Sequence, residues 1–353
     1  MRPDPFPDIV IRGKRMFATI AKLLVKRVLT AIPILLIVSA LLFCILRILP
    51  VDPAAMSLPP NATVEEVEAM RTEMGLDRPL YEQYGIWLGK LLEGDVGRSI
   101  HFRQDVTSLI GSTLPATIEL AVIAMVVATI FGLAGGLFLF YVRGTRAEAV
   151  MDFFSILLLS LPEFLWSLFL LLIFGVFFEV LPFTGRLSPG FERPVVTGFL
   201  LIDSLVTGNI STFFNALQHM ILPCLALGIA LSPSLMRVLR SSLLDAYQDD
   251  YIQQARLRGL SEKRILIRHG LKNAILPTLS LMGVQFGFLF GGTLLVEIIY
   301  SYPGMGNLMV DAIRNADLPI IQGAGLTYCI AVLVISIVVD SLYLILNPKL
   351  RAR

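Results

Sequence analysis

The chain has 353 residues, a formal net charge of +2 and a mean hydropathy of +0.76, with 56% hydrophobic and 16% charged residues. Soluble domains usually have about a quarter of their residues charged. The composition therefore leaves a polytopic membrane protein or an unusually apolar soluble one. The length of the apolar segments decides, because about 20 apolar residues are needed to cross a bilayer. Several segments reach that length, so the predicted fold class is an all-α polytopic membrane protein.

Six apolar segments are expected to cross the membrane as helices, because backbone exposed to lipid must form its hydrogen bonds internally. The third is long enough to be bent or broken at Pro162, and the first is expected to stay as an uncleaved span. Glycines in the second and fifth spans are interpreted as close helix packing. The predicted spans are residues 28–49, 117–142, 150–180, 219–239, 277–299 and 323–346, and the glycines are Gly132, Gly135, Gly136, Gly283, Gly287, Gly291 and Gly292.

The distribution of positive charge predicts the orientation of these spans. Twenty of the 29 lysines and arginines fall in segments that share one side of the membrane, and eight fall on the other side. Loops rich in Lys and Arg remain in the cytoplasm, so both termini are expected there. The predicted organisation is a cytoplasmic tail (1–27), a first transmembrane helix (28–49), an extracytoplasmic segment (50–115), a core with five transmembrane helices (116–346) that includes a basic loop (240–276), and a cytoplasmic tail (347–353).

The extracytoplasmic segment is predicted to contain short helices and no large core. Thr63 is placed to cap a helix from Val64 to Met74, and Glu66 has the spacing of a capping box. Gly75 supplies the stop at the C-terminal end of this helix. A second short helix is expected from Tyr81 to Leu92.

Motifs for nucleotide binding, metal-dependent proteolysis and serine hydrolysis are absent, since the chain contains no GxxxxGK[ST], HExxH or GxSxG pattern. The histidines are far apart in the sequence, so no metal site is expected. The cysteines lie in apolar segments and are interpreted as small buried side chains. These residues are His101, His219 and His269, and Cys44, Cys224 and Cys329. The chain is therefore not expected to be an enzyme.

Acidic residues within or beside the spans are candidates for a polar translocation path. A charge in the bilayer costs about 2.5–3.5 kcal/mol on insertion scales, so such groups usually face a cavity or a partner. Glu119, Glu163 and Glu297 are the path candidates, and an interfacial position is the alternative for each. Asp152 and Glu179 are expected to be interfacial. Asp340 is a further acid in this set, and a proton-driven carrier would also use intramembrane acids.

The basic loop has the pattern of a helix, a turn and a second helix. Asp249 and Asp250 suit the positive N-terminal end of a helix, Gly259 ends that helix, and Ser261 is placed to cap the next one. A helical and basic segment of this kind either docks a partner or rests on anionic lipid, and the residues alone leave both alternatives open.

Part of this loop resembles the segment through which the membrane subunits of ABC importers engage their ATPase. That segment has a Glu-Ala-Ala-x-x-x-Gly pattern, and Ala255 and Gly259 match it, whereas Gln253 and Gln254 do not. Other segments resemble the dipeptide/oligopeptide (and nickel) permease branch in the same order along residues 30–350. They are Leu49-Pro50-Val51-Asp52-Pro53, Gly75-Leu76-Asp77-Arg78-Pro79-Leu80, Gly94-Asp95-Val96-Gly97, Pro115-Ala116-Thr117-Ile118-Glu119-Leu120, Tyr302-Pro303-Gly304-Met305-Gly306 and Asn347-Pro348-Lys349.

The resemblance implies a type I ABC importer permease fold in the inner (plasma) membrane of a bacterium. It implies a passive half-channel that pairs with a second permease subunit, two cytoplasmic ATPase subunits and an extracytoplasmic substrate-binding protein. ATP and Mg would be bound by the ATPase subunits and no cofactor by this chain, and no nucleic acid is implied. The residues that the resemblance assigns to ATPase coupling are Gln253, Gln254, Ala255, Gly259, Leu260 and Arg264.

Peptides are the substrate class that this branch implies, with nickel chelates, glutathione and oligosaccharides as alternatives. A stand-alone secondary carrier and a membrane scaffold are hypotheses from other classes. The scaffold hypothesis gives no reason for motif matches along the whole chain.

Overall fold

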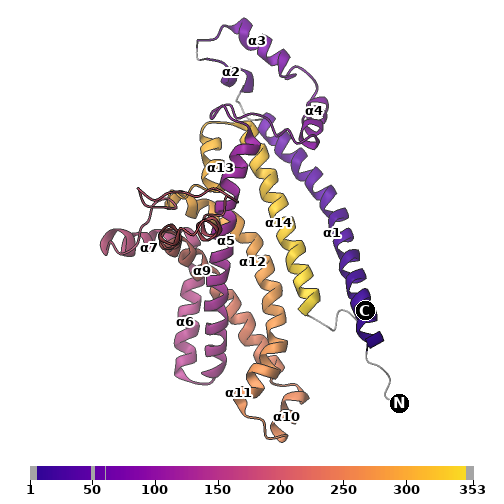
Figure 1. The fold of residues 1–353 in the computed structure, drawn as a ribbon, viewed down its shortest axis with the longest axis vertical. Coiled ribbons are helices and arrows are strands. Elements are labelled where there is room, and N and C mark those ends of the chain that lie inside the picture. The colour runs from indigo at the N-terminus through magenta and orange to yellow at the C-terminus, as the bar shows by residue number, and fades with distance from the viewer. Residues whose placement is uncertain (1–5, 49–51, 60, 347–353) are drawn as a thin grey trace.

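The computed structural model describes residues 6–48, 52–59 and 61–346, with side chains from residue 24 to residue 341 within that range. The described residues are mostly helical, and no named strand occurs among them. Figure 1 shows an elongated bundle of long helices with a group of short helices at one end. The Leu49-Pro50-Val51 part of the first motif and the tail 347–353 lie outside the described residues.

The N-terminal part of the chain forms one long helix followed by three short ones, which we call the cap. The long helix is α1 (Phe6–Ile48), and the cap contains α2 (Pro53–Ser57), α3 (Val64–Glu73) and α4 (Leu80–Leu92). The predicted capping box is confirmed, because Thr63 Oγ1 accepts from Glu66 N–H at 3.3 Å and Thr63 N–H donates to Glu66 Oε2 at 2.7 Å. Neither α3 nor α4 contains a buried residue, as expected for a segment without a large core.

The cap is joined to α1 by a cluster of aromatic side chains. Phe43 of α1 lies 5.6 Å from Tyr84 and 5.7 Å from Trp87 between ring centroids. The hydroxyls of Ser39 and Tyr84 form a hydrogen bond of 2.8 Å. Aromatic pairs at such distances stabilise beyond the area that they bury, so α4 is fastened to the end of α1.

The remaining helices form the core of the bundle. They are α5 (Val106–Tyr141), α6 (Arg146–Ser160), α7 (Glu163–Leu170), α8 (Leu200–Val206), α9 (Ile210–Ala246), α10 (Asp250–Leu257), α11 (Glu262–Ile265), α12 (Leu271–Ile299), α13 (Met305–Arg314) and α14 (Leu318–Leu346). Two π-helical turns, η1 (Leu171–Phe177) and η2 (Leu266–Gly270), continue α7 and α11. Among the residues that the structure describes, five helices, or six when the pair α6 and α7–η1 is taken as one span, are long and apolar enough to cross a membrane.

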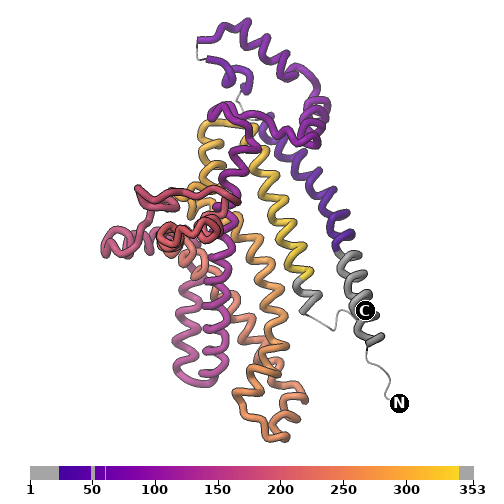
Figure 2. The backbone as a smooth tube through the Cα atoms, in the orientation of Figure 1, coloured from indigo at the N-terminus to yellow at the C-terminus, as the bar shows by residue number. Residues whose placement is uncertain are grey.

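The third predicted span is broken at Pro162, as expected. Leu161 adopts the extended conformation that a residue before proline favours, and α7 begins after Pro162 with a bend of 100° relative to α6. Figures 1 and 2 show that α7 consequently runs across the long helices and not along them. This part of the chain is therefore not a straight crossing.

Three helices begin well before the boundaries that hydropathy predicts. The helix expected from residue 28 begins at Phe6, within the predicted N-terminal tail, the helix expected from residue 117 begins at Val106, and the helix expected from residue 219 begins at Ile210. Residues 106–115, which the sequence pattern places in the extracytoplasmic segment, are the first turns of α5. Apolar content marks only the part of a helix that matches the bilayer, so it does not report polar turns that extend beyond it.

Glycines let α5 and α9 pack at short distance. A Cβ atom on Gly132 would lie 2.6 Å from Leu235 Cβ, and one on Gly228 of α9 would lie 2.5 Å from Val127 Cγ1. Real Cβ atoms do not make contacts that short, so these positions require glycine in this geometry. The packing interpretation also holds for Gly283, which faces Val339, but not for Gly291, which has open space where its Cβ would be.

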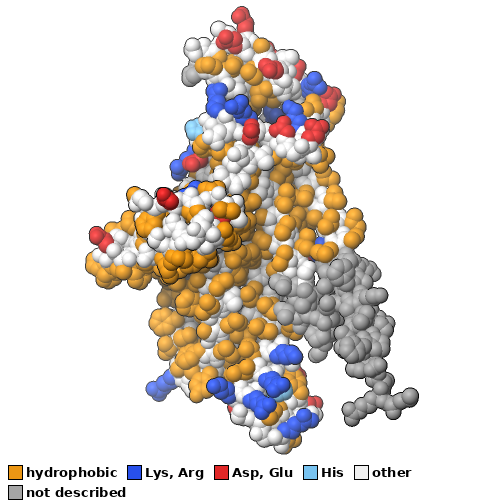
Figure 3. All heavy atoms as spheres, viewed as in Figure 1, with side chains coloured by type: hydrophobic (Ala, Val, Ile, Leu, Met, Phe, Trp, Pro, Cys, Tyr) orange, Lys and Arg blue, Asp and Glu red, His pale blue; other side chains and the backbone are white. Residues whose placement is uncertain are grey.

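The surface of the bundle fits a membrane environment. Figure 3 shows hydrophobic side chains over the middle of the visible face, Lys and Arg around the basic loop at one end, and charges of both signs at the cap end. Large apolar side chains such as Ile130, Phe153 and Phe288 are between 60% and 70% exposed. A contiguous apolar surface of this extent is typical of contact with lipid or with another subunit.

The glycine contact between α5 and α9 predicts an asymmetric result for two matched substitutions. Gly228→Ala should lower the free energy of unfolding by about 1–3 kcal/mol, because the added methyl group overpacks the interface. Gly111 is an exposed position on α5 where a Cβ would meet no atom within 4 Å. Gly111→Ala should therefore be neutral or slightly stabilising, because alanine favours helix. Thermal unfolding of the detergent-solubilised protein measures both, and equal effects would contradict the packing account.

Candidate coupling loop and buried carboxylates

The basic loop folds into a two-helix unit with a hydrophobic core of its own. Asp249 is the N-cap of α10 and Ser261 is the N-cap of α11, as predicted, although neither side chain makes a capping hydrogen bond. The side chains of Ile252 and Ile265 are fully buried against each other and against Ala255. The unit therefore keeps its shape by packing between its two helices.

Gly259 makes the turn between these helices. Its φ is +74°, in the left-handed region that other residues adopt only at a cost. Leu260 N–H donates to Ala255 O at 3.2 Å, which closes the end of α10. A Cβ on Gly259 would meet no atom within 4 Å, so the backbone conformation and not crowding is what requires glycine here.

The candidate coupling residues divide into an exposed group and a buried one. Gln253, Gln254, Gly259 and Arg264 are exposed, and Leu260 is half-buried. Ala255 is only 5% exposed and packs inside the loop, so its part in coupling stays a prediction. Its small size lets α10 approach Ile265 of the second helix.

Leu257 is the exposed residue that the sequence reading missed. Its side chain is 88% exposed at the end of α10, beside the glycine turn. A leucine in that position gains nothing from the fold of this chain, and an exposed apolar side chain beside polar ones is typical of a docking contact.

Tyr247 connects the loop to the bundle. Its ring lies 4.7 Å from the ring of Phe140 at the end of α5 and packs against both the core of the loop and the cluster around Leu239. The guanidinium groups of Arg143 and Arg256 lie 5.8 Å and 5.6 Å from it. A displacement of the loop would therefore be transmitted to α5 as well as to α9.

An ion pair braces the turn across the loop. Arg256 Nε donates to Glu262 Oε1 at 2.6 Å. This hydrogen bond lowers the pKa of Glu262 and raises the pKa of Arg256. The pair is solvent-exposed, so salt screens its contribution to the stability of the loop. The hydrophobic core of the loop is therefore the main source of the loop's stability.

Glu297 is completely buried and holds the start of α13. Its Oε2 accepts from Gly306 N–H at 2.7 Å and its Oε1 accepts from Thr117 Oγ1 at 2.6 Å. A carboxylate beside the N-terminus of a helix is favoured by the helix dipole. A Cβ on Gly304 would lie 2.4 Å from Glu297 Oε2, which gives a physical reason for glycine in the Tyr-Pro-Gly-Met-Gly motif. Glu297 therefore joins three helices and does not face an open path in this conformation.

Glu119 forms a buried ion pair with Arg186, which the sequence reading counted only as an outer positive charge. The side chains are 7% and 5% exposed. The second carboxylate oxygen of Glu119 accepts from Leu201 N–H at 2.7 Å, and the Arg186 guanidinium lies 5.6 Å from the Tyr302 ring. Both oxygens of Glu119 are thus used to fasten the segment between η1 and α9 onto α5, so this residue also is structural here.

Asp203 organises the same segment from within. Its carboxylate accepts from the backbone N–H groups of Val196, Thr197 and Gly198 and from Thr197 Oγ1, at 2.6–3.1 Å. Burial raises the pKa of Asp203, but these hydrogen bonds outweigh it and hold the pKa at about 2. The carboxylate therefore stays ionised at physiological pH and keeps the segment ordered.

Glu163 differs from the other two path candidates. It begins α7 at the break after Pro162, and its Oε1 lies close to Gly292 of α12, where a Cβ would be 2.9 Å away. The side chain is partly exposed, and no hydrogen bond to its carboxylate occurs among the described residues. Of the three candidates, Glu163 is the one that the geometry leaves available to an external group.

Of the remaining acids, two pair with arginines and one is exposed. Asp152 Oδ2 lies 3.7 Å from Arg240 Nη1, and Arg240 also pairs with Glu148. Asp340 pairs with Arg27 and so joins α14 to α1. Glu179 is exposed just beyond η1.

No cluster that could hold a metal ion occurs among the described residues. His219 is buried and its Nδ1 lies 2.8 Å from Asn215 O, within its own helix. Cys224 is buried as predicted and Cys329 is half-buried, but Cys44 is exposed. It lies on α1, where the surroundings of an outward-facing apolar side chain are lipid, so burial in protein was the wrong expectation.

The arrangement defines a polytopic helical membrane protein with a rigid basic loop between two of its spans. Sequence comparison then identifies the group to which it belongs. Residues 128–352 match the family model "Binding-protein-dependent transport system inner membrane component", and residues 20–121 match the N-terminal model of the same systems. The chain belongs to this family of multi-pass inner-membrane permeases, within the dipeptide/oligopeptide type of ABC importers.

Individual relatives agree with this assignment. The chain is 35% identical to the di/tripeptide transport system permease protein DppB of Pseudomonas aeruginosa, over 91% of this chain and 96% of that protein. It is also 35% identical to the glutathione transport system permease protein GsiC of Shigella flexneri, over 93% of this chain and 98% of that protein. A solved structure of the methionine ABC transporter MetNI superposes with a TM-score of 0.52 at 13% identity, covering 68% of this chain and 96% of that one, which supports the type I permease fold.

The buried pair between Glu119 and Arg186 predicts a large loss of stability when one partner is removed. Glu119→Gln should lower the free energy of unfolding by about 3–5 kcal/mol, because Arg186 is left buried without its counter-charge. Arg240→Gln breaks ion pairs whose side chains are 17–37% exposed. It should therefore lower the free energy of unfolding by less than Glu119→Gln does.

Denaturation of the purified protein measures this difference. The double variant Glu119→Gln/Arg186→Met should cost less than the two single variants together, because the unpaired charge is gone. A near-neutral Glu119→Gln would show that the pair does not fasten the segment.

Proposed function

We propose that this chain forms half of the translocation path of an ATP-driven importer for small peptides. The single observation that carries the coupling part of the proposal is the basic loop, which packs as a rigid unit, is continuous with α12 and joins α9, and exposes Leu257 beside Gly259. The substrate part is supported by 35% identity to a di/tripeptide permease along nearly the whole chain.

In this proposal an ATPase subunit grips the exposed side of the basic loop. Gln253, Gln254, Leu257 and Arg264 supply polar, apolar and cationic contacts, while Ala255 and Gly259 maintain the shape of the loop. Movement of the ATPase would displace the loop as a unit, and Tyr247 would pass that displacement to α5 through Phe140. A ligand shifts such an equilibrium only through different affinities for the two states, so the ATPase must hold the loop differently with and without ATP.

The partners follow from this arrangement. A second permease subunit would complete the path, two ATPase subunits would bind ATP and Mg, and a substrate-binding protein would deliver the substrate at the cap end. No cofactor and no catalytic activity are assigned to this chain. The distribution of Lys and Arg supports a cytoplasmic position for the basic loop and both termini, with the cap outside.

Glu163 is the residue of this chain that we assign to the path. Its carboxylate has no protein hydrogen bond among the described residues and lies beside the glycine-rich surface of α12. A peptide carries a protonated amine, which such a carboxylate attracts. Glutathione also carries an amine, and identity to a glutathione permease over 93% of this chain makes it the second candidate substrate.

Transport into proteoliposomes that contain this chain, its second permease subunit and the ATPase subunits tests the proposal. With the binding protein on the cap side and ATP on the side of the basic loop, labelled di- and tripeptides should accumulate. Competition by unlabelled glutathione would identify glutathione as a substrate as well. Accumulation driven by an ion gradient, without ATP or partners, would instead identify a secondary carrier.

Substitution of Gly259 separates coupling from folding. Gly259→Glu forces a non-glycine residue into φ +74° and adds a charge beside Leu257, so ATP-driven uptake should fall by about 5- to 150-fold, the range of typical coupling free energies, while the protein still inserts. The matched control is Gly190→Glu, since Gly190 also has positive φ and open space but lies between η1 and α8. Normal uptake by the Gly259 variant would contradict this role of the loop.

A further inference from the structure

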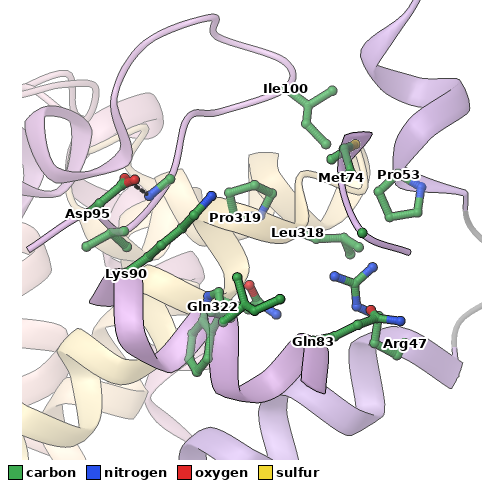
Figure 4. A pocket seen from close by; sticks show the side chains of 15 residues that line it. Arg47, Pro53, Met74, Gln83, Lys90, Asp95, Ile100, Leu318, Pro319 and Gln322 are labelled. Atoms are coloured by element: carbon green, nitrogen blue, oxygen red, sulfur yellow. Dashed lines mark hydrogen bonds between the residues drawn. The ribbon is translucent and has the colours of Figure 1, made fainter. Parts of the chain in front are cut away.

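A pocket of about 240 Å³ lies between the cap and the first turns of α14. Its walls come from the end of α1, from α4, from residues 95–100 and from Leu318, Pro319 and Gln322 (Figure 4). Nothing in the proposed transport cycle uses this pocket, and it lies at the opposite end of the molecule from the basic loop (Figure 1).

The pocket carries an excess of positive charge. Arg47 and Lys90 line it together with one carboxylate, that of Asp95. Neither cation forms an ion pair within the described residues, whereas Asp95 Oδ1 already accepts from Gly97 N–H at 2.8 Å (Figure 4). The other oxygen of Asp95 makes no hydrogen bond within the described part of the chain. The lining therefore offers two cationic donors and one free carboxylate oxygen.

Arg47 shows that the pocket is built to receive a polar group. Its Nε is buried and has no hydrogen-bond partner within the described residues, and Gln322, which is 7% exposed, lines the same pocket. Leaving a buried donor unpaired costs free energy. Figure 4 shows Gln322 between Lys90 and Arg47 in the lining of the pocket, so a ligand group beside Gln322 lies between the two cations.

The position of the pocket identifies the source of that ligand. Arg47 is the last residue but one of the span Leu24–Ile48, which places the pocket at the depth of the lipid headgroups. Leu41 and Ile45 on the same helix are 56% and 57% exposed, and an acyl chain can lie against them. Trp87 of α4 belongs to the aromatic residue types that concentrate at membrane–water interfaces.

We propose that this pocket binds the headgroup of a phospholipid from the leaflet on the cap side. The phosphate pairs with Arg47 and Lys90 and accepts a hydrogen bond from the Gln322 amide, and a headgroup ammonium pairs with the free oxygen of Asp95. The ammonium partner for Asp95 makes phosphatidylethanolamine the lipid that we assign to the pocket. The bound lipid holds the cap against the start of α14.

Native mass spectrometry of the purified chain with added lipids tests this assignment. Wild-type protein should retain phosphatidylethanolamine, and Lys90→Gln and Arg47→Gln should each lower the bound fraction by about tenfold, the effect of losing one charge-assisted hydrogen bond. Lys90→Arg should restore binding. Arg193→Gln, an exposed cation outside the pocket, should leave the bound fraction unchanged.

Competition identifies the ligand. Inorganic phosphate, glycerophosphoethanolamine and a dipeptide should each fail to displace the lipid at equal concentration, because they lack acyl chains. Displacement by phosphate or glycerophosphoethanolamine would overturn the lipid in favour of a soluble anion, and displacement by the dipeptide would make the pocket a substrate site. Unchanged lipid retention in both Lys90→Gln and Arg47→Gln would overturn the site itself. Lys90 is exposed on α4, so its variant is expected to fold.

Discussion

Close packing between α5 and α9 is the constraint on which the rest of this structure depends. The two helices approach through Gly132 and Gly228, where any side chain would collide with Leu235 or Val127. In a membrane, where helices gain little from hydrophobic burial, such close contact is a main source of association. The helix α9 leads into the basic loop, and α5 carries Thr117 and Glu119 toward the cap end. The α5–α9 interface therefore fixes the position of the loop relative to these polar groups.

The polar groups within the bundle serve first to hold its parts together. Glu297 joins α5, α12 and α13 through Thr117 and Gly306, and Glu119 with Arg186 holds the segment before α9. A buried ion pair or carboxylate adds little net stability, but it penalises alternative arrangements heavily. We therefore interpret these groups as fixing one arrangement of the helices that they join. A displacement of the basic loop would then move those helices together.

The break at Pro162 and the capping box at Thr63 could be predicted from sequence, because each depends on residues that are neighbours in the chain. The roles of Glu119 and Glu297 could not, because Arg186 and Gly306 reach them only through the tertiary fold. Hydropathy placed the centres of the long helices but not the start of α5 at Val106. The motif match identified the basic loop, yet only the packing of Ala255 against Ile265 separated the residues that shape the loop from those that face outward.

We propose that an ATPase subunit docks on the exposed tip of the basic loop, and cysteine cross-linking detects such a contact. A cysteine at Leu257, 88% exposed on the loop, should form a disulfide with cysteines introduced on the surface of the ATPase subunit in the assembled complex, and nucleotide should change its yield. A cysteine at Val64, 85% exposed on the cap, should not. Cross-linking from position 64, or none from position 257 at any nucleotide state, would contradict the account.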